Sequence, residues 1–196
     1  MSDSPRIVLA STSPYRAQLL RRLLDDFEQI APGVKESALD GEAPGARAAR
    51  LAEAKAHAVA KHFDDAIVIG SDQVAEVDGR MLDKPGTHAN ARSQLAACSG
   101  RTVRFHTALC VIDARRVDHC AQAIDLTRVV FRELSAEEIA RYVGCEQPLD
   151  CAGGFKAEGL GIALFERIES QDPAALIGLP LIALSRLLRD CGLPLP

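Results

Sequence analysis

The fold is decided at residues 6–16, which read Arg6-Ile7-Val8-Leu9-Ala10-Ser11-Thr12-Ser13-Pro14-Tyr15-Arg16. The first five of these residues form a short apolar run, which is typical of a buried strand. Pro14 is well suited to the first position of a helix, and the predicted helix runs from there to about Leu24. A strand that passes through a hydroxyl-rich turn into a helix indicates an α/β fold.

The rest of the chain continues this alternation of strands and helices. Asp78-Gly79 is a strong signal for a two-residue hairpin, Thr87 can cap a helix, and Ser135 with Glu138 forms a capping box for a short helix. The tail Leu193–Pro196 is expected to be frayed. We expect strands over 27–31, 66–70, 74–77, 80–82, 101–113, 117–131 and 163–168, and helices over 45–62, 88–97 and 181–189. All 196 residues are expected to form one domain.

Composition and charge exclude several classes of protein. Hydrophobic residues make up 47% and charged residues 26% of the chain, which is ordinary globular usage. The formal net charge is −4 and the basic residues are scattered, so binding to a nucleic-acid duplex is not expected, while a small phosphorylated ligand stays open. No apolar run is long enough to span a bilayer, and the start Met1-Ser2-Asp3-Ser4-Pro5 does not resemble a signal peptide. We therefore expect a cytoplasmic protein without membrane contact.

The turn at Ser11-Thr12-Ser13 is a candidate anion site. Hydroxyl groups, free backbone N–H groups and the positive end of the helix dipole meet where the strand enters the helix. Arg16 shares a helical stripe with Leu20, Leu23 and Phe27, which predicts an inward cation there. The simpler interpretation is that Ser13 only caps the helix.

A second cation and a carboxylate strengthen the interpretation of a charged site. Lys55 follows Leu51 by four residues on the apolar side of the alanine-rich helix, although it could also extend its ammonium to the surface. Asp72 follows the most apolar strand, where open α/β sheets bind ligands, although it could also cap a turn. The hairpin could bring Lys84 back towards Asp72.

The sequence carries few other motifs that indicate a metal site or a nucleophile. The five histidines contain no His-x-x-x-His pair, so a zinc site is not expected, and hard-cation chemistry through Asp72 and Glu36 is the remaining metal option. The six cysteines contain no Cys-x-x-Cys pair and are expected to be reduced and mostly buried. Four glycines in 153–161 predict a tight loop, which matches neither a dinucleotide fingerprint nor a phosphate-binding loop of NTPases.

Together these motifs resemble the Maf nucleotide pyrophosphatases along nearly the whole chain. The resemblance is carried by Leu9-Ala10-Ser11-Thr12-Ser13-Pro14-Tyr15-Arg16, Gly70-Ser71-Asp72-Gln73-Val74, Lys84-Pro85, Gly154-Phe155-Lys156-Ala157-Glu158-Gly159 and the run from Asp172-Pro173 to Ile177-Gly178-Leu179-Pro180. Ser-Asp-Gln and Phe-Lys-x-Glu-Gly are similar to the YceF-type branch, which acts on N7-methyl-GTP. The resemblance implies an elongated, twisted mixed sheet flanked by helices, with two lobes and a central cleft.

The resemblance also implies an activity and roles for residues. The family hydrolyses a nucleoside triphosphate between its α and β phosphates with a divalent metal, Mg²⁺ or Mn²⁺. Asp72 would accept the proton and Glu36 would help to hold the metal with it. Ser11, Arg16, Lys55 and Lys84 would hold the triphosphate, and Tyr15, Gln73 and Glu158 would select the base. A homodimer is left open.

Three departures from the family pattern and two alternative functions accompany this hypothesis. Tyr15 stands where tryptophan is expected, and Asp83 and Ser170 stand where glycine is more common. One alternative is the dTTP and UTP pyrophosphatase of the same family, which Gln73 and Glu158 disfavour. The other is a nucleotide-sensing regulator of cell division without turnover, which the intact Asp72 disfavours.

Overall fold

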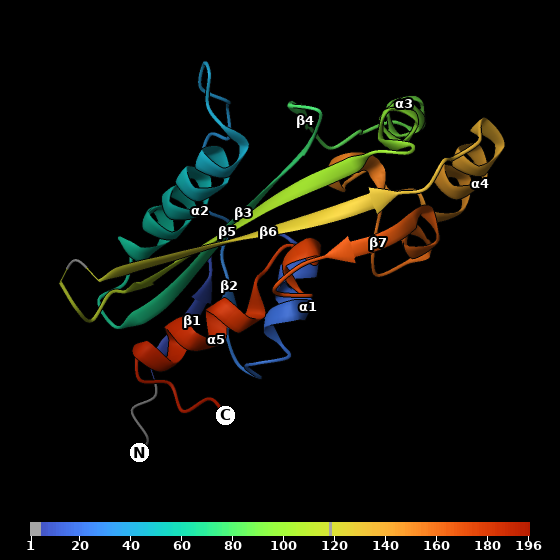
Figure 1. The fold of residues 1–196 in the computed structure, drawn as a ribbon. Coiled ribbons are helices and arrows are strands. Elements are labelled where there is room, and N and C mark those ends of the chain that lie inside the picture. The colour runs from blue at the N-terminus through green and yellow to red at the C-terminus, as the bar shows by residue number, and fades with distance from the viewer. Residues whose placement is uncertain (1–4, 118) are drawn as a thin grey trace. The chain divides into compact units, whose positions relative to one another are not determined.

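A computed structural model describes residues 5–117 and 119–196 (Figure 1). Two predictions therefore lie partly outside the described residues. Residues 1–4 belong to the N-terminal stretch that does not resemble a signal peptide, and residue 118 belongs to the predicted strand 117–131. The helices and strands are β1 (Arg6–Leu9), α1 (Pro14–Leu20), β2 (Glu28–Gln29), α2 (Pro44–Ala60), β3 (Ala66–Val77), β4 (Arg80–Leu82), α3 (His88–Cys98), β5 (Thr102–Asp113), β6 (Cys120–Phe131), α4 (Ala136–Glu146), β7 (Phe165–Glu169) and α5 (Leu181–Asp190). No helix among these residues is long and apolar enough to cross a membrane.

The strands form one mixed sheet in the order β2-β1-β3-β5-β6-β7, and β4 pairs with β3 beside this path. This arrangement confirms the predicted α/β fold with a mixed sheet flanked by helices. β1 runs parallel to both β2 and β3, whereas β3 and β4 are antiparallel. The contacts divide the chain into two compact units: unit 1 holds residues up to Gln73, 107–125 and 172–196, and unit 2 holds 74–106 and 126–171.

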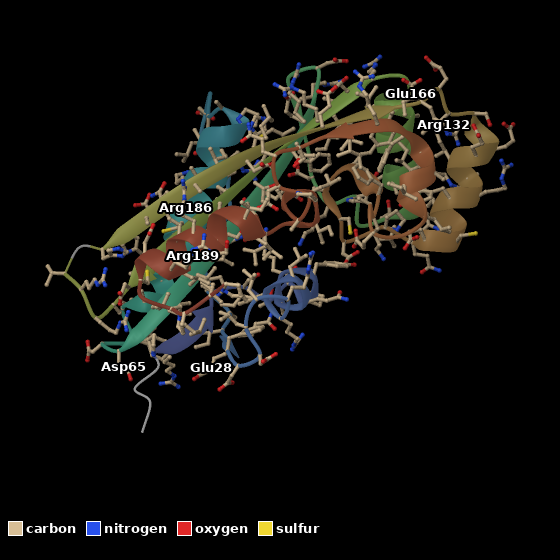
Figure 2. All side chains as sticks on the ribbon, turned by 60° about the horizontal axis from the view of Figure 1, so that its bottom comes forward. Glu28, Asp65, Arg132, Glu166, Arg186 and Arg189 are labelled. Atoms are coloured by element: carbon tan, nitrogen blue, oxygen red, sulfur yellow. The ribbon has the colours of Figure 1, made fainter. Side chains whose placement is uncertain are left out.

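Unit 1 has helices on both faces of its strands. α1 and α5 share one apolar core with the same-side residues of β1, β3 and β5, among them Leu9, Ile69 and Leu109. α5 turns Leu184 and Leu188 into this core, while Arg186 and Arg189 project outward (Figure 2). α2 packs on the opposite face and comes so close to β3 that a Cβ at Gly70 would lie 2.3 Å from the Ala52 carbonyl oxygen.

Unit 2 contains the hairpin and an aromatic core. Asp78 and Gly79 both have positive φ angles, 49° and 77°, as the tight turn between β3 and β4 requires. Four phenylalanines, at 105, 131, 155 and 165, meet edge to face with ring centroids 4.9–5.4 Å apart. The predicted caps are confirmed, because Thr87 accepts from the backbone of Asn90 and the capping box of Ser135 and Glu138 is complete.

Several predicted boundaries were wrong. α1 ends at Leu20 rather than near Leu24, because the backbone tightens there into bonds from Arg22 to Leu19 and from Leu23 to Leu20. The strand predicted over 27–31 is reduced to Glu28–Gln29. The strands predicted separately over 66–70 and 74–77 form one continuous strand, because β3 pairs with β1 at 66–69, with β4 at 75–77 and also has β5 as a neighbour.

Two further expectations were also wrong in part. Leu193 in the tail belongs to the core of unit 1, and Leu195 packs against it, so these positions are not frayed. All six cysteines are free, as predicted, but only Cys98, Cys110 and Cys191 are buried.

Candidate functional site

The centre of the candidate site is a buried lysine between two carboxylates. Lys55, on the inward face of α2, is 5% exposed and Asp72, on β3, is 7% exposed. The Lys55 Nζ lies 2.5 Å from Asp72 Oδ1 and 2.6 Å from Glu36 Oε1. The predicted inward orientation of Lys55 is therefore confirmed, and its charge is balanced by two carboxylates at hydrogen-bond distance.

Glu36 comes from the loop before α2, and its side chain is half exposed. Two arginines on α2 hold this loop, because Arg47 Nη2 donates to the Glu36 carbonyl at 3.1 Å and Arg50 Nη2 donates to the Ser37 carbonyl at 3.2 Å. Arg50 is itself fixed by a bidentate pair with Glu42. The same helix thus supplies Lys55 and positions the loop that brings Glu36 to it.

The head of α1 brings a second cation to this region of unit 1. Arg16 donates through Nε to the Gly178 carbonyl at 2.9 Å and through Nη1 to Ser11 Oγ at 3.5 Å. Burial lowers the pKa of the Arg16 guanidinium, and the carboxylates of Asp72 and Glu36 partly offset this effect. Ser13 caps the helix through the backbone N–H of Arg16, so the simpler interpretation of Ser13 holds together with an inward Arg16.

Adjacent residues on β3 point to opposite faces of the strand, as its pleat requires. Asp72 points towards α2, whereas Ser71 donates to the Ala108 and Gly178 carbonyls on the other side. The Gln73 Nε2 contacts Thr107 Oγ1 and the carbonyls of Ala175 and Leu176 at 2.9–3.1 Å. The amide nitrogen of Gln73 therefore anchors the segment before α5.

The remaining predicted residues divide between the units. Tyr15 is half-buried on the first turn of α1, in unit 1. Lys84 and Glu158 are exposed in loops of unit 2, so their convergence with Asp72 stays a prediction. Asp83 is exposed, and its carbonyl accepts from Gln94, while Ser170 accepts a hydrogen bond from Thr127 within unit 2.

The carboxylates of Glu36 and Asp72 fit a hard divalent cation. Each carboxylate places an oxygen within 2.6 Å of the Lys55 Nζ, so both already surround one cation, the Lys55 ammonium. Carboxylate oxygens are the ligands that Mg²⁺ and Mn²⁺ prefer. A second group of possible ligands, formed by Glu53, His57 and Cys120, has a different donor chemistry.

Comparison of the sequence with known proteins shows the family to which the chain belongs. The family model described as Maf-like protein matches residues 6–191. The chain belongs to the Maf family. It is 57% identical over 192 residues to a protein of Xanthomonas axonopodis pv. citri (strain 306) named 7-methyl-GTP pyrophosphatase, covering 98% of this chain and 100% of that one. A protein of the same name from Paraburkholderia xenovorans (strain LB400) is 54% identical over 203 residues, covering 100% of this chain and 98% of that one.

The fold of this Maf chain is also similar to that of solved structures. The Staphylococcus aureus Ham1 protein aligns with a TM-score of 0.53 at 16% identity, covering 94% of this chain and 98% of that one. At this level of identity the similarity concerns the fold alone, and it agrees with the mixed α/β architecture.

Sequence reasoning missed residues that hold the site in place. In unit 1, the Asp172 carboxylate accepts from the backbone of Ala174 and of Ile182, which fixes the segment leading to Gly178. In unit 2, Tyr142 Oη accepts from the backbone of Lys156, and Glu146 accepts from that of Leu160. Asp172 belongs to one of the motifs that carry the family resemblance. Tyr142 and Glu146 could not be predicted from neighbouring residues, because their hydrogen-bond partners lie in a different element.

Proposed function

We propose that this chain is a house-cleaning nucleoside triphosphate pyrophosphatase, which hydrolyses N7-methyl-GTP to N7-methyl-GMP and pyrophosphate. The observation that carries the proposal is the group formed by buried Lys55 and Asp72 with half-exposed Glu36, in the unit that also turns Arg16 inward. The relatives at 57% and 54% identity, both named 7-methyl-GTP pyrophosphatase, support the choice of substrate. We also propose that the reaction takes place in the cytoplasm.

Asp72 is proposed as the proton acceptor. A water molecule attacks the α-phosphorus, Asp72 takes a proton from it, and the bond from that phosphorus to the bridging oxygen breaks. The electron pair leaves with the bridging oxygen, so the products are the monophosphate and pyrophosphate. The hydrogen bond from Lys55 Nζ at 2.5 Å keeps the Asp72 carboxylate in place before substrate binds.

The cations are proposed to neutralise the triphosphate. Arg16 lies at the positive end of α1 beside Ser11, so a phosphate oxygen there would receive guanidinium and hydroxyl hydrogen bonds together. Lys55 would exchange a carboxylate for a phosphate oxygen, and Lys84 would contribute a further charge. This neutralisation matters most as negative charge builds up on the departing pyrophosphate.

A divalent metal is proposed to be held by Glu36 and Asp72. When bound, Mg²⁺ or Mn²⁺ supplies further positive charge to the phosphate oxygens. With both carboxylates holding the metal, Lys55 would be able to contact the substrate.

Base recognition is proposed to combine stacking with a carboxylate. N7-methylated guanine is cationic, so stacking on Tyr15 adds a cation–π interaction of roughly 0.5–2 kcal/mol. Glu158 accepts hydrogen bonds only, which suits the N1–H and N2–H₂ edge of guanine and disfavours the two carbonyls of uracil or thymine. Gln73 would present its carbonyl oxygen, since its nitrogen is engaged by Thr107 and the 175–176 backbone.

The proposal is tested by a pyrophosphate-release screen over N7-methyl-GTP, GTP, UTP and dTTP with Mg²⁺ or Mn²⁺. We expect the highest kcat/KM for N7-methyl-GTP and no release without a divalent metal. A higher kcat/KM for dTTP or UTP would overturn the proposed substrate, N7-methyl-GTP. The proposed reaction, release of pyrophosphate from a nucleoside triphosphate, would still stand. Nucleotide binding without pyrophosphate release from any of the four would favour the sensing regulator instead.

A further inference from the structure

Three side chains with metal-binding chemistry meet on the surface of unit 1, away from the buried face of α2. Glu53 and His57 lie one turn apart on α2, and Cys120 begins β6. One ligand atom from each lies within 4.8 Å of the other two, and Glu53 Oε1 is 3.8 Å from His57 Nε2. The function proposed above uses none of these three residues.

The donor set indicates which metal would bind. A carboxylate, an imidazole and a thiolate together suit Zn²⁺ or a similar borderline cation, whereas Mg²⁺ and Mn²⁺ prefer oxygen ligands alone. Ligand atoms of a tetrahedral zinc site lie roughly 3.3–3.8 Å apart, given the usual bond lengths. The observed separations reach this range with side-chain movements of about 1 Å, which surface residues on a helix and a strand end can make.

A second thiol lies next to Cys120. The sulfur of buried Cys110 on β5 lies 3.3 Å from the sulfur of Cys120. With Cys120 bound to a metal as thiolate, the Cys110 S–H can donate a hydrogen bond to it. Such support from a neighbouring residue orients ligands in metal sites and raises affinity.

We propose that Glu53, His57 and Cys120 form a binding site for a zinc-type divalent cation, separate from the carboxylates of Asp72 and Glu36. The three residues supply three ligands, and water completes the coordination. A bound ion joins α2 to β6 directly, so it stabilises the folded state by an amount that rises with the logarithm of the ion concentration relative to its Kd. Lys55 lies between Glu53 and His57 in the sequence but on the buried face of α2, so both sites can be occupied together.

Cobalt is the probe that tests the site, because Co²⁺ bound to a thiolate gives a characteristic near-ultraviolet charge-transfer absorption. Reduced full-length protein is titrated with Co²⁺, and the bound Co²⁺ is then displaced with Zn²⁺. We expect one cobalt per chain with the thiolate absorption, and a higher melting temperature with Zn²⁺. Cys120→Ser should remove the absorption and His57→Gln should weaken binding at least tenfold, since even supporting residues cost about 10–100-fold.

Matched controls use exposed residues of the same type outside the cluster. Cys145→Ser and His62→Gln should leave cobalt binding at the wild-type level. Wild-type protein without thiolate absorption, or equal affinity in Cys120→Ser, would overturn the proposal. Pyrophosphate release with Mg²⁺ should be unchanged in Cys120→Ser and His57→Gln. Asp72→Asn should still bind cobalt with the thiolate absorption. The proposal for this metal site and the proposed pyrophosphatase function can therefore be refuted separately.

Discussion

Lys55 shares its charge between two carboxylates, buried Asp72 and half-exposed Glu36. A buried ammonium without partners would be strongly unfavourable, and the buried carboxylate of Asp72 would carry a similar penalty alone, whereas Glu36 is half exposed. The three groups therefore stabilise one another before any nucleotide arrives. Their arrangement also holds the Asp72 carboxylate in one position, with Lys55 Nζ 2.5 Å from Oδ1.

Asp72→Asn tests this acceptor. The amide oxygen can still accept from Lys55, so we expect the fold and nucleotide binding to persist, while turnover falls by about 10² or more because an amide cannot take the proton. Steady-state pyrophosphate release and calorimetric nucleotide binding measure the two effects. Asp78→Asn, the same change in the exposed hairpin, should be neutral. Turnover near the wild-type rate in Asp72→Asn would remove Asp72 from this role.

Glu158→Gln tests base selection. The glutamine keeps the size of the side chain but adds a donor, so we expect lower activity on N7-methyl-GTP and weaker exclusion of UTP. A mismatched acceptor costs a few kcal/mol, so the ratio of the two kcat/KM values should fall by up to about a hundredfold. Glu166→Gln, another exposed carboxylate of unit 2, is the control (Figure 2). An unchanged ratio would mean that Glu158 does not read the base.

Individual residues differed in how far the sequence could predict them. The helical spacing predicted that Lys55 points inward, and the structure buries it. The spacing did not show that Glu36 and Asp72 hold Lys55, because the three come from a loop, a strand and a helix that only the fold brings together. Gln73 was predicted as a ligand group, but its hydrogen bonds to the backbone of 175–176 depend on chain segments far apart in sequence.

At the scale of elements, α2 and β3 are held at a separation that only glycine permits. A Cβ at position 70 would lie 2.3 Å from the Ala52 carbonyl oxygen and 2.7 Å from the Ala56 backbone nitrogen. Since these are backbone atoms of the helix, a side chain could be accommodated only by moving α2 away from the strand. The distance between Lys55 and Asp72 depends on this contact.

Gly70→Ala should therefore lower both stability and turnover. Overpacking of this kind typically costs about 1–3 kcal/mol, and we expect a loss in this range in urea unfolding together with reduced pyrophosphate release. The control is Gly144→Ala in α4, where a Cβ meets nothing within 4 Å and helix propensity favours alanine by about 0.5–1 kcal/mol. Wild-type stability in Gly70→Ala would show that α2 can shift freely.

The elements that the sequence predicted best are those with local causes. The turn at Asp78-Gly79, the cap at Thr87 and the capping box at Ser135 depend on neighbouring residues only, and all three are confirmed. The break predicted at 71–73 was wrong because a strand lasts as long as it has partners, and β3 pairs with β1 at 66–69 and with β4 at 75–77 while β5 is its other neighbour. Partner exchange of this kind depends on the order of strands, which periodicity does not reveal.

The stability of the whole molecule should depend on pH through the turn between β5 and β6. Arg115 binds both carboxylate oxygens of buried Asp113 at 2.8 Å, and this hydrogen bonding lowers the pKa of Asp113 below its ordinary value. Because the unfolded chain takes up this proton first, the stabilisation is complete above the unfolded pKa of about 3.9 and is lost as pH falls through the folded pKa.

Asp113→Asn measures this contribution. We expect the free energy of unfolding at pH 7 to fall by about 1–3 kcal/mol, and the difference from wild type to shrink as the pH is lowered below 4. Urea unfolding at several pH values gives the comparison, and Asp64→Asn is the exposed control. A difference that stays constant down to acidic pH would show that ionisation of Asp113 is not the cause.

The order in which the ribosome makes the chain adds a consequence for unit 1. Its core joins Leu9 and Ile69 to Leu184 and Leu188, and the residues of unit 2 are synthesised largely between these two groups. At about 5–20 residues per second, β3 therefore waits roughly 6–23 s and β1 roughly 9–35 s for α5, which covers their apolar face. During that interval the nascent chain exposes the apolar residues of β1 and β3 to solvent. We therefore expect it to bind chaperones that recognise apolar segments of nascent chains.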